Sequence, residues 1–137
     1  NFPEGPPYPT RTISDGTHRL ILTLTPGELF IEKHLMGLKG NAVLNNPYWA
    51  TWVRDAWQKP AIYNLVKRYQ SRPPLSFYNS HKDPYEMYDL ASGSDYQIRI
   101  KQMRKELEAW MKREGDPGIL LDSREAHQAA KAGKHLF

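Results

Sequence analysis

The chain has 137 residues, 39% of them hydrophobic, which is enough to bury one modest core but not two full domains. It contains no cysteine, so disulfides, zinc–thiolate sites and a cysteine nucleophile are excluded from these residues. The formal charge of +4 suggests attraction to anionic partners, and the absence of a long apolar run predicts no membrane-spanning helix. No motif of the known nucleic-acid-binding modules appears, so no nucleic-acid partner is expected.

The amino-terminal part of the chain predicts a linker followed by a hairpin. Residues 1–9 are rich in proline and read as extended linker, which favours a processed product or a piece of a longer protein. Residues 10–25 predict two antiparallel strands, because runs of strand-forming residues flank Asp15-Gly16, a dipeptide suited to a tight turn. Alternating leucines from Leu20 to Leu24 predict that at least one face of the hairpin is buried.

Residues 27–72 predict a helical insert. A short helix is expected within Gly27 to Met36, ended by Gly37 and Gly40, and Asn46-Pro47 is a typical start for the next helix. Pro60 interrupts this helix, and the same apolar stripe then continues up to Arg72-Pro73-Pro74. The helical spacing of three tryptophans favours a place in the core over stacking on sugar rings; they are Trp49, Trp52 and Trp57.

The carboxyl-terminal half predicts a strand, a turn, a long helix and a tail. Residues 74–91 contain the third strand and the turn that leaves it, and residues 95–115 form the clearest helix, stopped by Gly115 as a left-handed cap. Ser94 with Gln97 fits a capping box. Residues 116–137 predict a frayed helical tail. The expected buried side of the long helix consists of Ile100, Met103, Leu107, Trp110 and Met111.

Together these elements predict an α+β fold, with a small antiparallel sheet of three to four strands covered by helices and a long carboxyl-terminal amphipathic helix. Residues 1–137 are expected to form a single unit. The basic residues of the long helix alternate with Glu106 and Glu108, which is typical of a solvated outer face.

A resemblance to a known family rests on the stretch Asp83-Pro84-Tyr85-Glu86-Met87-Tyr88-Asp89-Leu90-Ala91. It resembles the D-P-x-E-x-x-N-L-A turn near the carboxyl end of sulfatases, with Asp89 where that family usually has Asn. The stretch Tyr8-Pro9-Thr10-Arg11 and the order of features across residues 7–118 resemble the heparan N-sulfatase branch. The chain therefore resembles the carboxyl-terminal subdomain of a larger enzyme, whose upstream catalytic domain would be its partner.

The resemblance implies hydrolysis of sulfuric esters or N-sulfamates on sulfated carbohydrates. It also implies a bound calcium ion and a formylglycine made from the Cys or Ser of a C/S-x-P/A-x-R motif. No serine of this chain is followed by an arginine four residues later, so the nucleophile is expected upstream and the chain alone is not expected to be catalytically competent. The resemblance also implies export to a periplasm, the cell surface or a lysosome.

Within such an enzyme this part of the chain would wall the substrate cleft. Arg11 is the first candidate for binding a sulfate or carboxylate, because its guanidinium can pair with an anion in bidentate fashion, and an ordinary edge-strand arginine is the alternative. His18 and Arg19 come next. The five histidines are scattered and lack metal-ligand spacing, so no metal site is expected.

A different class of function stays open on the sequence alone. The basic charge and the tryptophans also fit a self-contained, non-catalytic module that binds a polyanion or an acidic partner. Whether the chain folds alone or pairs with another copy through an apolar face, as a homo-oligomer, is likewise open.

Overall fold

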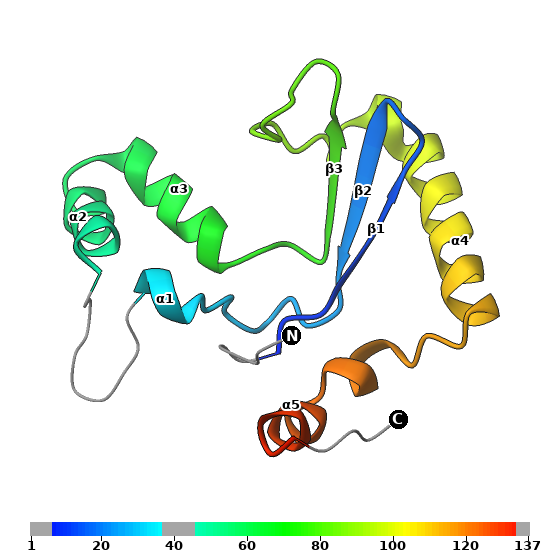
Figure 1. The fold of residues 1–137 in the computed structure, drawn as a ribbon. Coiled ribbons are helices and arrows are strands. Elements are labelled where there is room, and N and C mark those ends of the chain that lie inside the picture. Colours follow the sequence, from blue (N-terminus) through cyan, green and yellow to red (C-terminus); the bar gives the residue numbers. More distant parts are fainter. Residues whose placement is uncertain (1–6, 37–45, 134–137) are drawn as a thin grey trace. The chain divides into compact units, whose positions relative to one another are not determined.

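A computed structural model describes residues 7–36 and 46–133 (Figure 1). They belong to two compact units. The sheet unit consists of Pro9–Thr25 and Pro73–Asp122, and the helical unit contains the described residues 7–8, 26–36, 46–72 and 123–133. Among the described residues, no helix combines the length and apolar composition that crossing a bilayer requires.

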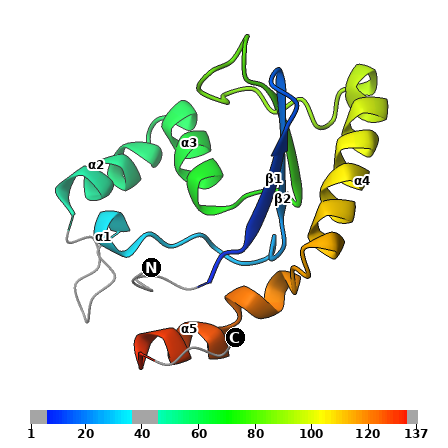
Figure 2. The ribbon, with the colours of Figure 1, turned by 45° about the vertical axis from the view of Figure 1, so that its right-hand side comes forward.

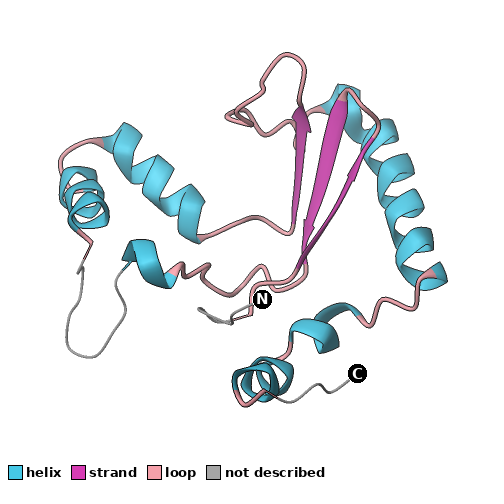
Figure 3. Ribbon diagram, in the orientation of Figure 1, coloured by secondary structure: helices cyan, strands magenta, loops and turns pink. Residues whose placement is uncertain are grey.

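The sheet unit contains the predicted three-stranded antiparallel sheet, drawn in magenta in Figure 3. Its strands are β1 (Thr10–Ser14), β2 (His18–Thr23) and β3 (Leu75–Asn79), in the order β1-β2-β3. The predicted turn joins the first two strands, with Gly16 at a φ of 91°, where a side chain would be strained. The Asp15 carboxylate accepts hydrogen bonds from the backbone N–H groups of Thr17 and His18, which closes the turn.

One long helix covers one face of this sheet. Helix α4 (Gln97–Arg113) follows a 3-10 turn (Ser94–Tyr96) and runs along the strands, as Figure 2 shows from a second direction. Its apolar stripe meets the inward-facing residues of β2 and β3, because alternate strand residues point to the same face. The α+β fold class is therefore confirmed. The buried cluster consists of Leu20, Leu22, Phe77, Ile100, Met103 and Leu107.

Two expectations for α4 are wrong. Trp110 keeps 44% of its surface exposed, because it lies at the edge of the apolar stripe in the last turn of the helix. The capping box is absent: the residue before the helix is Tyr96, which makes no side-chain cap hydrogen bond. Instead the Gln97 amide donates to the carbonyls of Ala91 and Gly93, which ties the helix start to the preceding turn.

The turn after β3 is held by two aspartates. The Asp83 carboxylate accepts a hydrogen bond from the N–H of Tyr88, five residues on. Asp89 accepts from the N–H groups of Phe77 and Ala91, and the N–H of Leu90 donates to the Phe77 carbonyl. The turn therefore covers the outer edge of β3 at its centre, where an unpaired strand edge would otherwise be open.

A salt bridge ties the segment after α4 back to β1. Gly115, at a φ of 66°, ends the helix in the predicted left-handed conformation. The next residue, Asp116, accepts two hydrogen bonds from the Arg11 guanidinium, Nε to Oδ2 at 2.5 Å and Nη2 to Oδ1 at 2.9 Å. Asp116 also accepts from the N–H of Gly118, so both carboxylate oxygens are used.

The helical unit contains α1 (Lys33–Met36), α2 (Pro47–Ala56), α3 (Pro60–Gln70) and α5 (Arg124–Lys131). Asn46 caps α2 as predicted, and Ser123 caps α5 within the predicted tail. The first predicted helix is only four residues long, and its expected stops Gly37 and Gly40 lie outside the described residues.

The predicted core stripe of tryptophans is correct only for Trp49. The other two are exposed, by 49% at Trp52 and 88% at Trp57. The reason is that α2 and α3 are separate short helices, and Trp57 lies in the loop between them. The apolar stripe of α2 therefore does not continue into α3 across Pro60.

Two substitutions on α4, one in the buried cluster and one on the exposed face, should have unequal costs. Leu107→Ala should lower the free energy of unfolding by about 2–5 kcal/mol, because it leaves a cavity against the sheet. Ile98→Ala, at a position that is 85% exposed, should change it by less than about 0.5 kcal/mol. Denaturant unfolding measures both, and equal losses would contradict the packing described here.

The tie between Arg11 and Asp116 predicts a pH dependence. The hydrogen bonds from Arg11 and from the Gly118 N–H lower the Asp116 pKa to about 2, against about 3.9 in an unfolded chain. The stabilisation is therefore fully present above about pH 4 and is lost as the pH falls through about 2. In Arg11→Met the Asp116 pKa should rise towards its ordinary value, as a carboxyl NMR titration would show. Arg113→Gln, which removes a nearby charge from α4, should leave it low, and an unchanged pKa in Arg11→Met would refute the tie.

Candidate functional site

The structure does not bring the three predicted substrate-binding residues together. Arg11 lies opposite Leu22 in the sheet, whereas His18 lies at the start of β2, four residues away and hence about 13 Å along the strand. Arg11 and His18 both lie on the face of the sheet that α4 covers. Arg19 follows His18 directly and therefore points to the opposite face.

Arg11 is held by the protein itself. Besides the two hydrogen bonds to Asp116, it donates to the carbonyls of Thr10 and Gly118. Only 14% of its side chain is exposed. A guanidinium so fully engaged fits a structural role, and an incoming anion would have to compete with Asp116 for it.

His18 lies at the edge of the core, at the turn end of the sheet. Its ring stacks on Phe77 at 5.2 Å and is 3.5 Å from the Asn79 side-chain nitrogen. Asp15 lies 3.6 Å from the other ring nitrogen and also pairs with Arg99 of α4. Backbone hydrogen bonds within the turn and the Arg99 guanidinium hold the Asp15 pKa below its usual range. This cluster joins the hairpin to the start of α4.

Arg19 is the most accessible of the three. Its side chain is 46% exposed, and its Nη1 donates to the Glu86 carboxylate at 2.8 Å. Glu86 has a φ of 53°, an uncommon value for a residue with a side chain, and it lies in the turn after β3. The remaining N–H groups of Arg19 have no acceptor among the described residues.

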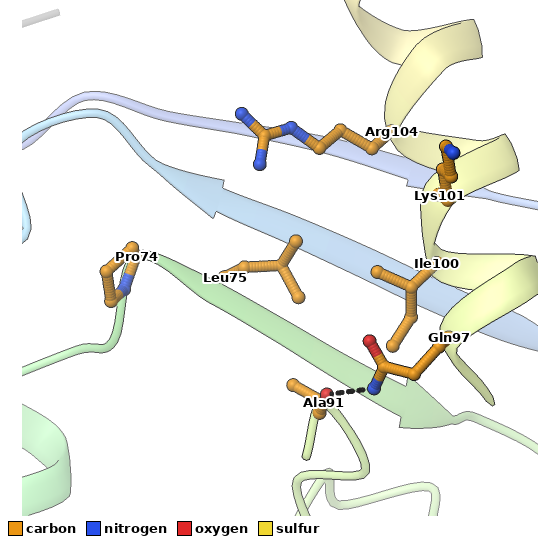
Figure 4. A pocket seen from close by; sticks show the side chains of 7 residues that line it. All are labelled: Pro74, Leu75, Ala91, Gln97, Ile100, Lys101 and Arg104. Atoms are coloured by element: carbon orange, nitrogen blue, oxygen red, sulfur yellow. Dashed lines mark hydrogen bonds between the residues drawn. The ribbon is translucent and has the colours of Figure 1, made fainter. Parts of the chain in front are cut away.

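A shallow groove of about 570 Å³ lies between β3 and the first half of α4 (Figure 4). Figure 4 shows the side chains of Leu75 and Ile100 between the two elements, with Arg104 extending from the helix. Arg104 pairs with Glu108, and the ammonium group of Lys101 has no ion pair within the described part of the chain. Sequence reasoning assigned these basic residues to a solvated face and missed the groove. The lining consists of Pro74, Leu75, Ala91, Gln97, Ile100, Lys101 and Arg104.

The described residues offer no place for the calcium ion or the formylglycine that the family resemblance implies. No three histidine or acidic side chains lie close enough to hold a metal ion in residues 7–36 and 46–133. Serine is present, but never four residues before an arginine, and cysteine is absent from the sequence. We therefore assign neither group to a residue of this chain.

Comparisons with known proteins point to one class of enzyme. No family model matches the chain. It is 25% identical over 113 residues to an ulvan-active sulfatase of Formosa agariphila, which covers 80% of this chain and 18% of that protein. It is 28% identical over 91 residues to another ulvan-active sulfatase of the same organism, covering 66% of this chain and 13% of that protein.

The chain thus spans less than a fifth of the length of these curated relatives. The similarity to the first of them covers most of the chain. It does not single out the heparan N-sulfatase branch. Together with the α+β fold, it supports a relation between this chain and the sulfatases.

Proposed function

We propose that the chain is the carboxyl-terminal subdomain of a sulfatase that acts on a sulfated polysaccharide. The observation that carries this proposal is the similarity of 80% of the chain to less than a fifth of an ulvan-active sulfatase. Because the chain matches only 18% of that sulfatase, it corresponds to one part of a longer enzyme. The place at the carboxyl end rests on the resemblance of residues 83–91 to the sulfatase turn.

In this proposal the chain supports the catalytic domain and walls the substrate cleft, and does no chemistry itself. The nucleophile and calcium ligands would come from upstream residues of the same polypeptide. Export to a periplasm, the cell surface or a lysosome is proposed on the same resemblance. The heparan N-sulfatase branch has no support from the two relatives, so ulvan is the first substrate to test.

Arg19 becomes the first candidate for a contact with substrate, ahead of Arg11 and His18. Its side chain is 46% exposed and, among the described residues, has guanidinium N–H groups without an acceptor, whereas Arg11 is engaged by Asp116 and His18 packs on Phe77. Its pairing with Glu86 restrains the side chain, which lowers the entropy lost on binding an anion.

The whole-protein test is the release of inorganic sulfate from ulvan by the polypeptide expressed from the complete coding region. Measurable release that requires the upstream part supports the proposal. No release from ulvan, heparan sulfate or small sulfate esters by the folded polypeptide would overturn it. A non-catalytic module that binds polyanions would then be the better account.

Variants of the same polypeptide test the role of Arg19. Arg19→Met should lower kcat/KM by about tenfold or more, chiefly through KM, if the guanidinium binds a charged group of the substrate. Glu86→Gln removes the ion pair but keeps the arginine, so it should retain most of the activity. Equal losses in both variants would assign the effect to the turn, and unchanged kinetics in Arg19→Met would remove Arg19 from the site.

A further inference from the structure

Five aromatic rings form a continuous chain of contacts within the helical unit. Neighbouring ring centroids are 6.2, 5.8, 5.5 and 5.5 Å apart, close enough for each ring to pack on the next. The rings come from α2, from α3, from the segment before α1 and from the start of the described chain. In order they belong to Trp52, Trp49, Tyr69, Phe30 and Tyr8.

Arg72 lies over the last two rings of this chain. Its guanidinium carbon is 4.5 Å from the centroid of Phe30 and 5.7 Å from that of Tyr8. Such contacts use the charge of the guanidinium and leave the N–H groups at its rim free for other partners. Pro73 follows directly and restricts Arg72 to extended backbone conformations. The side chain is thus restrained before any ligand arrives.

The N–H groups of Arg72 have no acceptor within the described residues. Neither a hydrogen bond nor an ion pair joins Arg72 to any of them. This separates it from Arg11, Arg19 and Arg99, each of which pairs with a carboxylate. A partly buried guanidinium with no acceptor is an unusual arrangement, because burial removes water from its donors.

A second unpartnered polar group lies on the same ring pair. The Tyr8 hydroxyl is buried and has no hydrogen-bond partner among the described residues. A buried hydroxyl without a partner is unfavourable and calls for an acceptor or donor from outside. Burial raises the pKa of Tyr69, the negative charge of Glu32 raises it further, and the positive charge of Arg72 opposes the rise. The Glu32 carboxylate already accepts from the N–H of Leu35.

We propose that Arg72, Tyr8 and Phe30 form a binding site for an oxyanion carried by a sugar, either a sulfate ester or a carboxylate. The planar guanidinium would donate two hydrogen bonds to it, and the Tyr8 hydroxyl a third. Phe30 holds the guanidinium in place, and the half-exposed Trp52 ends the ring chain. The identity of the ligand as a charged sugar rests on the proposed function, whereas the site itself rests on the unpartnered groups.

The test is direct binding to the 137-residue chain by calorimetry, with ulvan oligosaccharides before and after chemical desulfation. Arg72→Met keeps an apolar side chain over the rings and should weaken binding at least tenfold. Arg72→Lys keeps the charge but loses the planar fork, so it should recover only part of the affinity. Arg54→Gln removes the same charge from α2 and should change affinity less than twofold. Loss of binding on desulfation identifies a sulfate, and retained binding identifies a carboxylate.

Tyr8→Phe gives a readout that a structural role would not produce. The hydroxyl has no partner among residues 7–36 and 46–133, so its removal should leave the melting temperature unchanged or higher. Ligand affinity should nevertheless fall several-fold. The site is refuted if the folded wild-type chain binds neither oligosaccharide, or if Arg72→Met weakens binding no more than Arg54→Gln. Arg72-dependent binding without sulfate release by the complete polypeptide would uphold the site and refute only the sulfatase proposal.

Discussion

The sheet unit depends on one contact, the packing of the α4 stripe against the apolar face of a three-stranded sheet. A sheet this small buries too little surface to be stable alone, and α4 closes it with Met103 and Leu107 against Leu20 and Phe77. Side chains alternate between the two faces of a strand. Once the apolar residues face α4, the residues between them must therefore lie on the opposite face. Arg19, next to Leu20, is thereby directed away from the core.

Two arginine–aspartate pairs hold α4 at its ends. Near its start Arg99 pairs with Asp15 in the hairpin turn, and just after its end Asp116 pairs with Arg11 in β1. Charge-assisted hydrogen bonds of this kind fix geometry as well as add stability. The consequence for function is that Arg11, the first candidate from the sequence, is engaged by Asp116. Arg19 and Arg72 have N–H groups without an acceptor in the part of the chain that the structure describes.

Much of the sheet unit could be predicted from the sequence, because local signals determine it. The Asp15-Gly16 turn, the alternating leucines and Gly115 as a helix stop each act within a few residues, and all are confirmed. The Asp-for-Asn exchange at position 89 is also understandable. Only one side-chain oxygen of Asp89 accepts the two backbone hydrogen bonds, and an asparagine would supply the same oxygen.

The candidate site could not be predicted in the same way, because its features depend on residues far apart in the sequence. Arg11 meets Asp116 across 105 positions, and nothing near Arg11 marks that partner. Arg72 looked like the end of a helix before two prolines, and only folding places it over Phe30 and Tyr8. Trp57 kept the helical spacing of a core residue, but the break at Pro60 left it exposed.

The measurement that tests the account most directly is the sequence of the coding region upstream of Asn1. The account predicts a C/S-x-P/A-x-R motif several hundred residues earlier in the same reading frame, accompanied by acidic residues suited to calcium. A start codon close to Asn1, with no such motif before it, would contradict a sulfatase subdomain and leave a small non-catalytic α+β protein.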